Sequence, residues 1–103
     1  MATSPTQRSL KKLRDEGYLC QIVEHWNMFA HIRQDLFGFI DIVAIKEGET
    51  IGVQTTSRNN VSARATKIEG LESYPIVKSA GWRIVVHGWG KLKKGWDCKE
   101  IEM

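Results

Sequence analysis

The chain has 103 residues, 42% of them hydrophobic, and a formal net charge of +3. This length predicts one domain, residues 1–103, with a hydrophobic core and little room for a second one. The apolar runs are too short for a membrane span and the amino terminus has no apolar stretch typical of a signal peptide, so we expect no membrane partner. Two cysteines are too few for a disulfide framework, and we therefore expect an intracellular (cytoplasmic) protein.

The first elements in chain order are a helix and a strand. Residues 4–7, Ser-Pro-Thr-Gln, are typical of a helix start, with a capping serine, a proline in the first turn and a glutamine that completes a capping box. We expect the helix to end at Glu16, because Gly17 is a natural stop. Residues 18–26 are predicted as a strand, and residues 27–35 as a connection of uncertain form.

An apolar hairpin follows, and polar residues interrupt its centre. Residues 39–45 are apolar except for Asp41, and a turn at 47–49 leads to a second strand that carries Gln54 and Thr56. Because side chains alternate along a strand, Gln54 and Thr56 share one face. An even turn of two or four residues would place Asp41 opposite Thr56 with Gln54 at the diagonal, whereas an odd turn would put Gln54 on the other side.

The second half of the chain predicts helices and then strands. A helix is expected at 59–71, a shorter one at 73–80, and strands at 82–89 and 96–102 around a basic turn. The connection between the hairpin and strand 82–89 is long enough for a crossover. The order α-β-β-β-α-β-β predicts an α/β domain with a mixed sheet of about five strands flanked by helices.

A carboxylate and an amide that meet on one strand pair predict a metal site. Oxygen-only ligation suits Mg²⁺ or Mn²⁺ and not zinc. A lone buried carboxylate is costly, and a divalent cation removes that cost. The alternative is that Asp41 is an ordinary buried acid paired with Arg33 or another base, without any metal. Zinc is not expected, because the histidines and cysteines lack CxxC or paired-histidine spacing.

These residues resemble a known family. Gly38-Phe39-Ile40-Asp41, a strand, a turn and Gln54-Thr55-Thr56 are similar to the metal-binding signature of the PD-(D/E)XK nuclease superfamily, in its small Holliday-junction-resolvase-like branch. In that superfamily an Asp opens one strand, and an acid or Gln, with a Lys two residues later, lies on the next. The resemblance covers residues 4–89. It implies a restriction-endonuclease-like core and metal-dependent phosphodiester hydrolysis of DNA, with branched or junction DNA as a candidate substrate.

The resemblance also implies a role for each matching residue. Asp41 would be the central ligand of Mg²⁺ or Mn²⁺, Gln54 the second ligand and the carbonyl of Thr55 the third. Thr56 stands where the family has its catalytic lysine, which orients or activates the attacking water. A threonine hydroxyl can hold a water but supplies no positive charge, so we expect Lys67, or else Arg58, to replace that lysine.

The acid that many resolvases carry early in the first helix is missing, since Gln7 and Arg8 stand about there. Asp35 and Glu24 are the spare acids that can complete the site. The family's usual assembly leads us to expect a homodimer.

Basic and polar residues after the hairpin and near the carboxyl terminus are candidates for binding the DNA backbone. They are Arg58, Asn59, Arg64, Lys91, Lys93 and Lys94. Such contacts are independent of base sequence. Two other function classes stay open: a nucleic-acid-binding module that kept the nuclease-like fold without activity, and a protein-interaction domain in which the same strands serve only packing.

Overall fold

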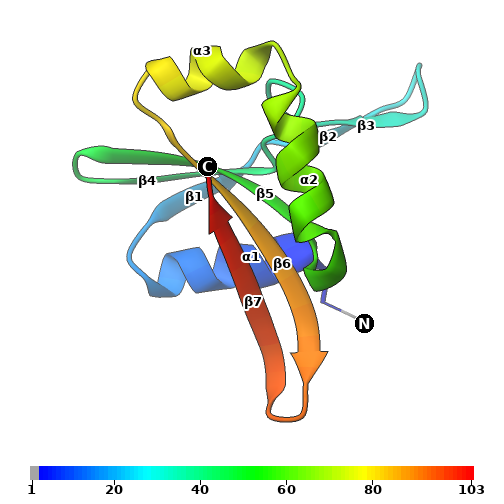
Figure 1. Cartoon of the computed structure of the whole chain (residues 1–103), viewed down its shortest axis with the longest axis vertical. Helices are drawn as coiled ribbons and strands as arrows, with labels where there is room; N and C mark the ends of the chain where they lie inside the picture. Colours follow the sequence, from blue (N-terminus) through cyan, green and yellow to red (C-terminus); the bar gives the residue numbers. More distant parts are fainter. Residues whose placement is uncertain (1–2) are drawn as a thin grey trace.

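The computed structural model describes residues 3–103 and shows an α/β domain built on a mixed five-stranded sheet (Figure 1). The strand order is β1-β4-β5-β6-β7, in which β5 and β6 are parallel and the other neighbours antiparallel. The strands are β1 (Leu19–Ile22), β4 (Ile42–Lys46), β5 (Glu49–Ser57), β6 (Arg83–Leu92) and β7 (Gly95–Glu102). The predicted fold class is thus confirmed at the level of a mixed α/β sheet flanked by helices. Within the described residues no helix has the length and apolar character that a bilayer crossing requires.

Helices cover both faces of this sheet, and each face has its own core. The helical elements are α1 (Pro5–Asp15), the 3₁₀ turn η1 (Arg58–Asn60), α2 (Val61–Glu69) and α3 (Ser73–Ser79). On one face Leu10 and Leu13 of α1 pack in a cluster with Ile51 and Val53 of β5. On the other face α2 and α3 pack in a second cluster with β6, whose members are Phe39, Ile40, Val61, Ile68, Val77, Ile84 and Val86.

The first helix begins and ends as predicted. The side chain of Ser4 accepts a hydrogen bond from the backbone N–H of Gln7 at 3.2 Å, and Pro5 occupies the first turn. The helix stops before Gly17, which adopts a positive φ of 94°. Thr6 and Ser9 are buried on the same side of the helix as Leu10 and Leu13. The amino-terminal half of α1 therefore presents polar groups to the sheet.

The hairpin between β4 and β5 differs from the prediction in register. Its turn has only two residues, 47 and 48, since Lys46 pairs with Glu49. Ile42 therefore lies opposite Val53, and the next step along the ladder brings Asp41 level with Gln54. The prediction that Asp41 lies opposite Thr56 was wrong by two residues, because the two-residue turn consists of Glu47 and Gly48 and its centre lies one residue earlier in the chain than that pairing requires.

The predicted strand 18–26 is two strands in different sheets. β1 ends at Ile22, and the N–H of Val23 donates to the carbonyl of Asp41 at 2.8 Å as the chain leaves the main sheet. Two short strands, β2 (His25–Asn27) and β3 (Ile32–Gln34), then form an antiparallel ribbon that projects from the body of the domain (Figure 1). The expected connection 27–35 thus contains a strand.

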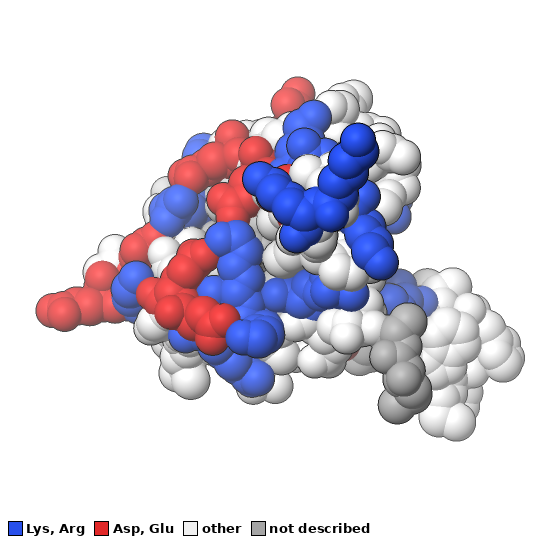
Figure 2. Space-filling model, turned by 90° about the horizontal axis from the view of Figure 1, so that it is seen from below, with Lys and Arg blue, Asp and Glu red and all other residues white. Residues whose placement is uncertain are grey.

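Charges of both signs are interspersed on much of the surface. Figure 2 shows Lys and Arg side chains beside Asp and Glu side chains on the face seen from below. On α1, Lys11 forms an ion pair with Asp15 at 2.8 Å, and Lys12 pairs with Glu16. The net charge of +3 therefore does not gather into one basic field over α1.

The crossover from β5 to β6 is held against the sheet by a glycine. A Cβ built on Gly88 of β6 would lie 1.9 Å from Cγ2 of Val61, the first residue of α2, and 3.0 Å from Cα of Arg58. Real Cβ atoms do not approach other atoms so closely. The close approach of η1 and α2 to β6 therefore requires glycine at this position.

We expect Gly88→Ala to lower the free energy of unfolding by about 3 kcal/mol or more, because the added methyl group must push the start of α2 away from β6. Urea denaturation monitored by tryptophan fluorescence measures this. Gly70→Ala is the matched control, since its Cβ would meet only the Lys67 carbonyl at 3.5 Å, and we expect a change within about 0.5 kcal/mol. Equal stability of both variants would show that the contact at Gly88 is not a constraint.

Candidate metal centre

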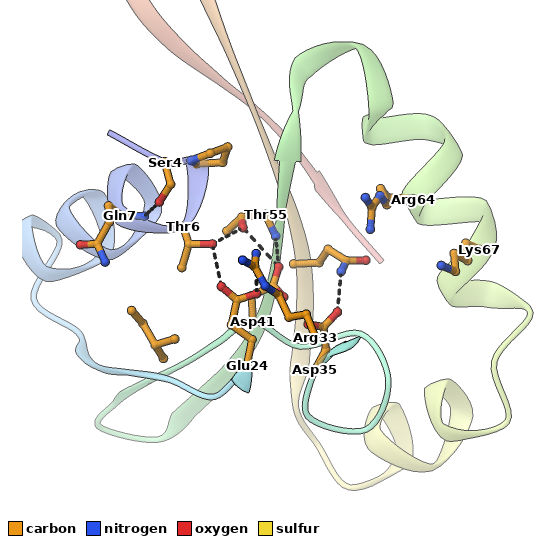
Figure 3. A pocket seen from close by; sticks show the side chains of 13 residues that line it. Ser4, Thr6, Gln7, Glu24, Arg33, Asp35, Asp41, Thr55, Arg64 and Lys67 are labelled. Carbon is orange, nitrogen blue, oxygen red and sulfur yellow. Dashed lines mark hydrogen bonds and ion pairs between the residues drawn. The ribbon is translucent and has the colours of Figure 1, made fainter. Parts of the chain in front are cut away.

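Three strand ends meet at one edge of the sheet. Because β1 and β5 both run antiparallel to β4, the end of β1, the start of β4 and the second half of β5 lie side by side. Glu24 follows β1, Asp41 immediately precedes β4, and Gln54 and Thr55 lie in β5. These four residues, together with Asp35 after β3, line a pocket of about 500 Å³ (Figure 3).

Asp41 is the most deeply buried acid of this pocket. Its side chain is 4% exposed. Its Oδ2 atom accepts hydrogen bonds from the backbone N–H of Thr55 at 2.7 Å and from the Thr55 hydroxyl at 3.2 Å. Thr55 therefore fixes the orientation of Asp41 from the neighbouring strand.

Two further carboxylates approach Asp41. Single carboxylate oxygens of Glu24, Asp35 and Asp41 all lie within 4.8 Å of one another. The Gln54 amide donates from Nε2 to Oδ2 of Asp35 at 3.5 Å, and a half-turn of this amide would present its oxygen instead. Three carboxylates and an amide oxygen are the donor set that Mg²⁺ and Mn²⁺ prefer. The residues present therefore fit such an ion.

The acids perturb one another. The pKa of Asp41 is raised to about 8, first because the carboxyl is buried and then because Asp35 and Glu24 place negative charge beside it; the Thr55 N–H acts in the opposite direction. Arg33 also lines the pocket, and its Nη1 atom lies 3.8 Å from Oε2 of Glu24. At neutral pH Asp41 thus holds a proton, which a divalent cation would displace.

Helix α1 contributes a residue that the sequence reading missed. Oγ1 of Thr6 lies 2.8 Å from Oγ1 of Thr55 and donates to Oε1 of Glu24 at 3.4 Å. The sequence pointed to Gln7 and Arg8 as the residues near this position. The helical period could have predicted this position, because Thr6 lies four residues before Leu10 and therefore on the side of the helix that faces the sheet.

Helix α2 forms the opposite wall of the pocket with two basic side chains. Arg64 and Lys67 both line the pocket, and Figure 3 shows their side chains pointing from α2 toward the acids. They are three residues apart, so they lie on the same face of the helix. The structure therefore brings Lys67, the expected substitute for the family's lysine, to the same pocket as Asp41 and Gln54.

Other predicted residues lie elsewhere among residues 3–103. Thr56 is buried opposite Gly88 of β6 and is not part of the pocket lining. Arg58 pairs with Asp97 of β7 at 2.6 Å, which makes it the weaker candidate for the missing charge. Asn59 is exposed in η1. The basic side chains of Lys91, Lys93 and Lys94 are exposed at and beside the β6–β7 turn.

A second cluster of possible ligands contains a histidine and a cysteine for which the sequence predicted no zinc site. His87, Cys98 and Glu100 offer ligand atoms within 4.8 Å of one another, because β6 and β7 place residues distant in sequence side by side. Burial, and then the charge of Glu100, raises the pKa of the Cys98 thiol to about 12, and Lys12 already lies 3.3 Å from Glu100. His87 is also partnered by α1, since its Nδ1 lies 2.8 Å from the hydroxyl oxygen of Ser9, so these side chains serve the packing of α1 on the sheet.

The chain matches no protein-family model and no curated protein. The chemistry of the pocket is therefore deduced from its own geometry: a buried acid fixed by Thr55, two further acids, an amide, and two cations on the facing helix.

The raised pKa of Asp41 predicts how stability depends on pH without divalent cations. An Asp in an unfolded chain titrates near 3.8, and Asp41 in the folded protein near 8. The folded state therefore keeps a proton that the unfolded state gives up, and stability falls between these values by at most about 1.4 kcal/mol per pH unit.

The variant Asp41→Asn keeps an acceptor for the Thr55 N–H but does not titrate. In EDTA we therefore expect the free energy of unfolding of this variant to exceed that of the wild type, by a margin that grows from pH 4 to pH 8. Denaturation at four pH values measures this. Asp15→Asn, at an exposed position of α1, serves as the control and should follow the wild-type profile. Parallel profiles for the wild type and Asp41→Asn would contradict the raised pKa.

Proposed function

We propose that this chain is a Mg²⁺- or Mn²⁺-dependent nuclease that hydrolyses phosphodiester bonds of DNA on a restriction-endonuclease-like core. The observation that carries the proposal is the convergence of Asp41, Glu24 and Asp35 with Gln54 at the strand ends. The buried acid, the amide on the next strand and the lysine in one pocket correspond to the parts that the sequence signature implies. The order of the strands around the pocket is compatible with that core.

The acids would hold the cation. Asp41, Glu24 and Asp35 supply carboxylate oxygens, and Gln54 supplies an amide oxygen after its half-turn. When bound, the ion neutralises charge on a phosphate oxygen and lowers the pKa of a water. Thr55 and Thr6 act indirectly, because their hydrogen bonds hold Asp41 and Glu24 in place.

The cations on α2 would act on the phosphate and the water. Hydrolysis replaces one P–O bond of the phosphodiester by a bond to the water oxygen, and negative charge builds up on the phosphorus oxygens in the transition state. Lys67 is exposed at the rim of the pocket, so its ammonium group can move to that charge. Arg64, one turn earlier, can bind a neighbouring phosphate with its planar guanidinium group.

A binding module without activity is the second candidate, and two observations favour it. Thr56 replaces the lysine of the signature and lies outside the described pocket lining. In addition, Thr55 already supplies two hydrogen bonds to Asp41, so the carboxyl is partly satisfied without a cation. Cleavage assays on duplex, single-stranded, flap and junction DNA with Mn²⁺ separate the two candidates.

We expect Asp41→Asn to abolish Mn²⁺ binding and to lower DNA cleavage by more than about 100-fold, because loss of a ligand costs more than loss of its hydrogen-bond partner. Calorimetric titration with Mn²⁺ and gel assays measure the two effects. Asp15→Asn changes an exposed acid outside the pocket and should bind and cleave as the wild type does. Wild-type cleavage by Asp41→Asn would make Asp41 a structural residue.

We expect Lys67→Ala to lower the cleavage rate by about 10- to 1,000-fold while the affinity for Mn²⁺ changes by less than about threefold, because its charge acts on phosphate and water and not on the ion. Lys99→Ala removes an exposed lysine of β7 and is the matched control. Equal loss of Mn²⁺ affinity and rate, or no loss of either, would assign the role to another residue.

A further inference from the structure

The ribbon of β2 and β3, residues 25–34, which we call the finger, exposes apolar side chains next to the candidate metal centre. The exposed fractions are Trp26 57%, Met28 74%, Phe29 100% and Ile32 50%. Figure 2 shows the right-hand end of the molecule, toward which the finger projects in Figure 1, as almost free of charged side chains. Leaving a cluster of this size in water is unfavourable, and such clusters commonly mark binding surfaces.

The tip of the finger is a structured turn. The side-chain oxygen of Asn27 accepts hydrogen bonds from the backbone N–H groups of Phe29 and Ala30, each at 3.0 Å. His31 adopts a positive φ of 54° and packs edge-on against Trp26, with 6.4 Å between the ring centroids. The fold therefore orders the backbone at the apex, from which the Phe29 side chain projects fully into solvent.

Apolar side chains lie on both faces of the finger. Trp26 pairs with Arg33, and Ile32 pairs with Asn27. Since neighbouring residues of a strand point to opposite faces, Trp26 and Ile32 lie on opposite sides of the ribbon, with Phe29 between them at the tip. A flat protein partner would cover one face only. Both faces and the tip of the finger are covered together only when the finger enters between two flat groups that stack on its two sides.

The base of the finger is part of the metal centre. Glu24 immediately precedes β2, and Asp35 immediately follows β3. A second pocket of about 580 Å³ lies along this base and shares Arg33, Asp35 and Lys67 with the first pocket. A nucleic acid backbone held by Lys67 and by a cation at the acids would thus continue past Arg33 toward the finger.

We propose that the finger is a wedge that stacks on nucleobases exposed where a DNA duplex is interrupted. Aromatic and aliphatic side chains stack on unpaired bases or enter opened base steps, and residues 25–34 contain basic and aromatic side chains but no acid. The proposal rests on the proposed function, since it takes the pocket to bind the scissile phosphate. If the finger acts as such a wedge, the metal centre binds and cleaves interrupted DNA duplexes in preference to continuous ones.

The length of the finger also sets where the cut would fall. Five residues of extended chain separate Asp35 from Ala30, next to the apex, which spans at most about 17 Å. Stacked bases rise about 3.4 Å each. The cut should therefore lie within about five nucleotides of the interruption.

The test compares the wild type with Phe29→Ala and Trp26→Ala. Neither side chain belongs to the two core clusters, so melting temperatures should stay within a few degrees of the wild type. One measurement is the fluorescence of 2-aminopurine placed at the unpaired position of a flap, in EDTA. The other is the ratio of cleavage rates, with Mn²⁺, on that flap and on a continuous duplex. Ile76→Ala, which removes a side chain 68% exposed on α3, is the control.

We expect the wild type and Ile76→Ala to change the probe's fluorescence and to prefer the flap. Phe29→Ala should lower both the affinity for the flap and this preference by roughly 5- to 100-fold, as the loss of one stacked base does. Cleavage with wild-type preference by Phe29→Ala and Trp26→Ala would overturn the wedge and leave the nuclease intact.

The remaining outcomes separate the two proposals. A Phe29-dependent fluorescence change without cleavage of any DNA would support the wedge and remove the nuclease. No response of the wild type to any DNA would overturn both. A finger variant that changes the molecular mass seen by light scattering, and not DNA binding, would make the finger a contact between copies of this chain and would also overturn the wedge.

Discussion

The buried carboxyl of Asp41 is the constraint around which the rest of the structure is arranged. Burial and two nearby acids make its ionised form unfavourable, so the group must hold a proton or receive a cation. Thr55 can bond to it only because β5 runs beside the start of β4. Glu24 and Asp35 reach the same place because β1 ends there and because the finger returns the chain to it.

The helices on the two faces of the sheet bring different groups to the pocket around Asp41. Helix α1 places Thr6 over Thr55 and Glu24 from the side of the leucine core. On the other face the tight contact at Gly88 holds the start of α2 against β6. The second turn of that helix then carries Arg64 and Lys67 to the pocket. Neutral hydrogen-bonding groups thus come from one helix and positive charge from the other, with the acids between them.

Local chemistry made much of this arrangement predictable from the sequence. Ser4 and Gly17 mark the ends of α1 through their own side-chain and backbone preferences. The interruption of an apolar strand by Asp41 predicted the buried acid, and the helix after the hairpin predicted Lys67 as a neighbour. The predicted register was wrong because it depends on which residues form the turn, and the sequence Glu47-Gly48-Glu49 allows more than one position for it.

The finger was missed for a different reason. Residues 18–26 read as one continuous strand, and what divides them is the bond from Val23 to the distant Asp41 carbonyl together with the turn at Asn27. The pairing of β2 with β3 therefore depends on tertiary contacts, although the hydrogen bonds of the Asn27 turn are local. A one-dimensional pattern cannot show that two acids 11 residues apart, Glu24 and Asp35, become neighbours through this ribbon.

Arg33 connects the finger to the acids. It lies opposite Trp26 in the ribbon and 3.8 Å from Glu24 in the pocket, and its side chain is 68% exposed. The Arg33 side chain is exposed, whereas that of Glu24 is only 15% exposed, so the guanidinium group can leave Glu24 for a phosphate where a cation compensates the charge of Glu24. Such an exchange would release Glu24 to a cation at the moment when a nucleic acid backbone arrives. Arg33 would then respond to the substrate, and Glu24 would complete the ligand set of the cation.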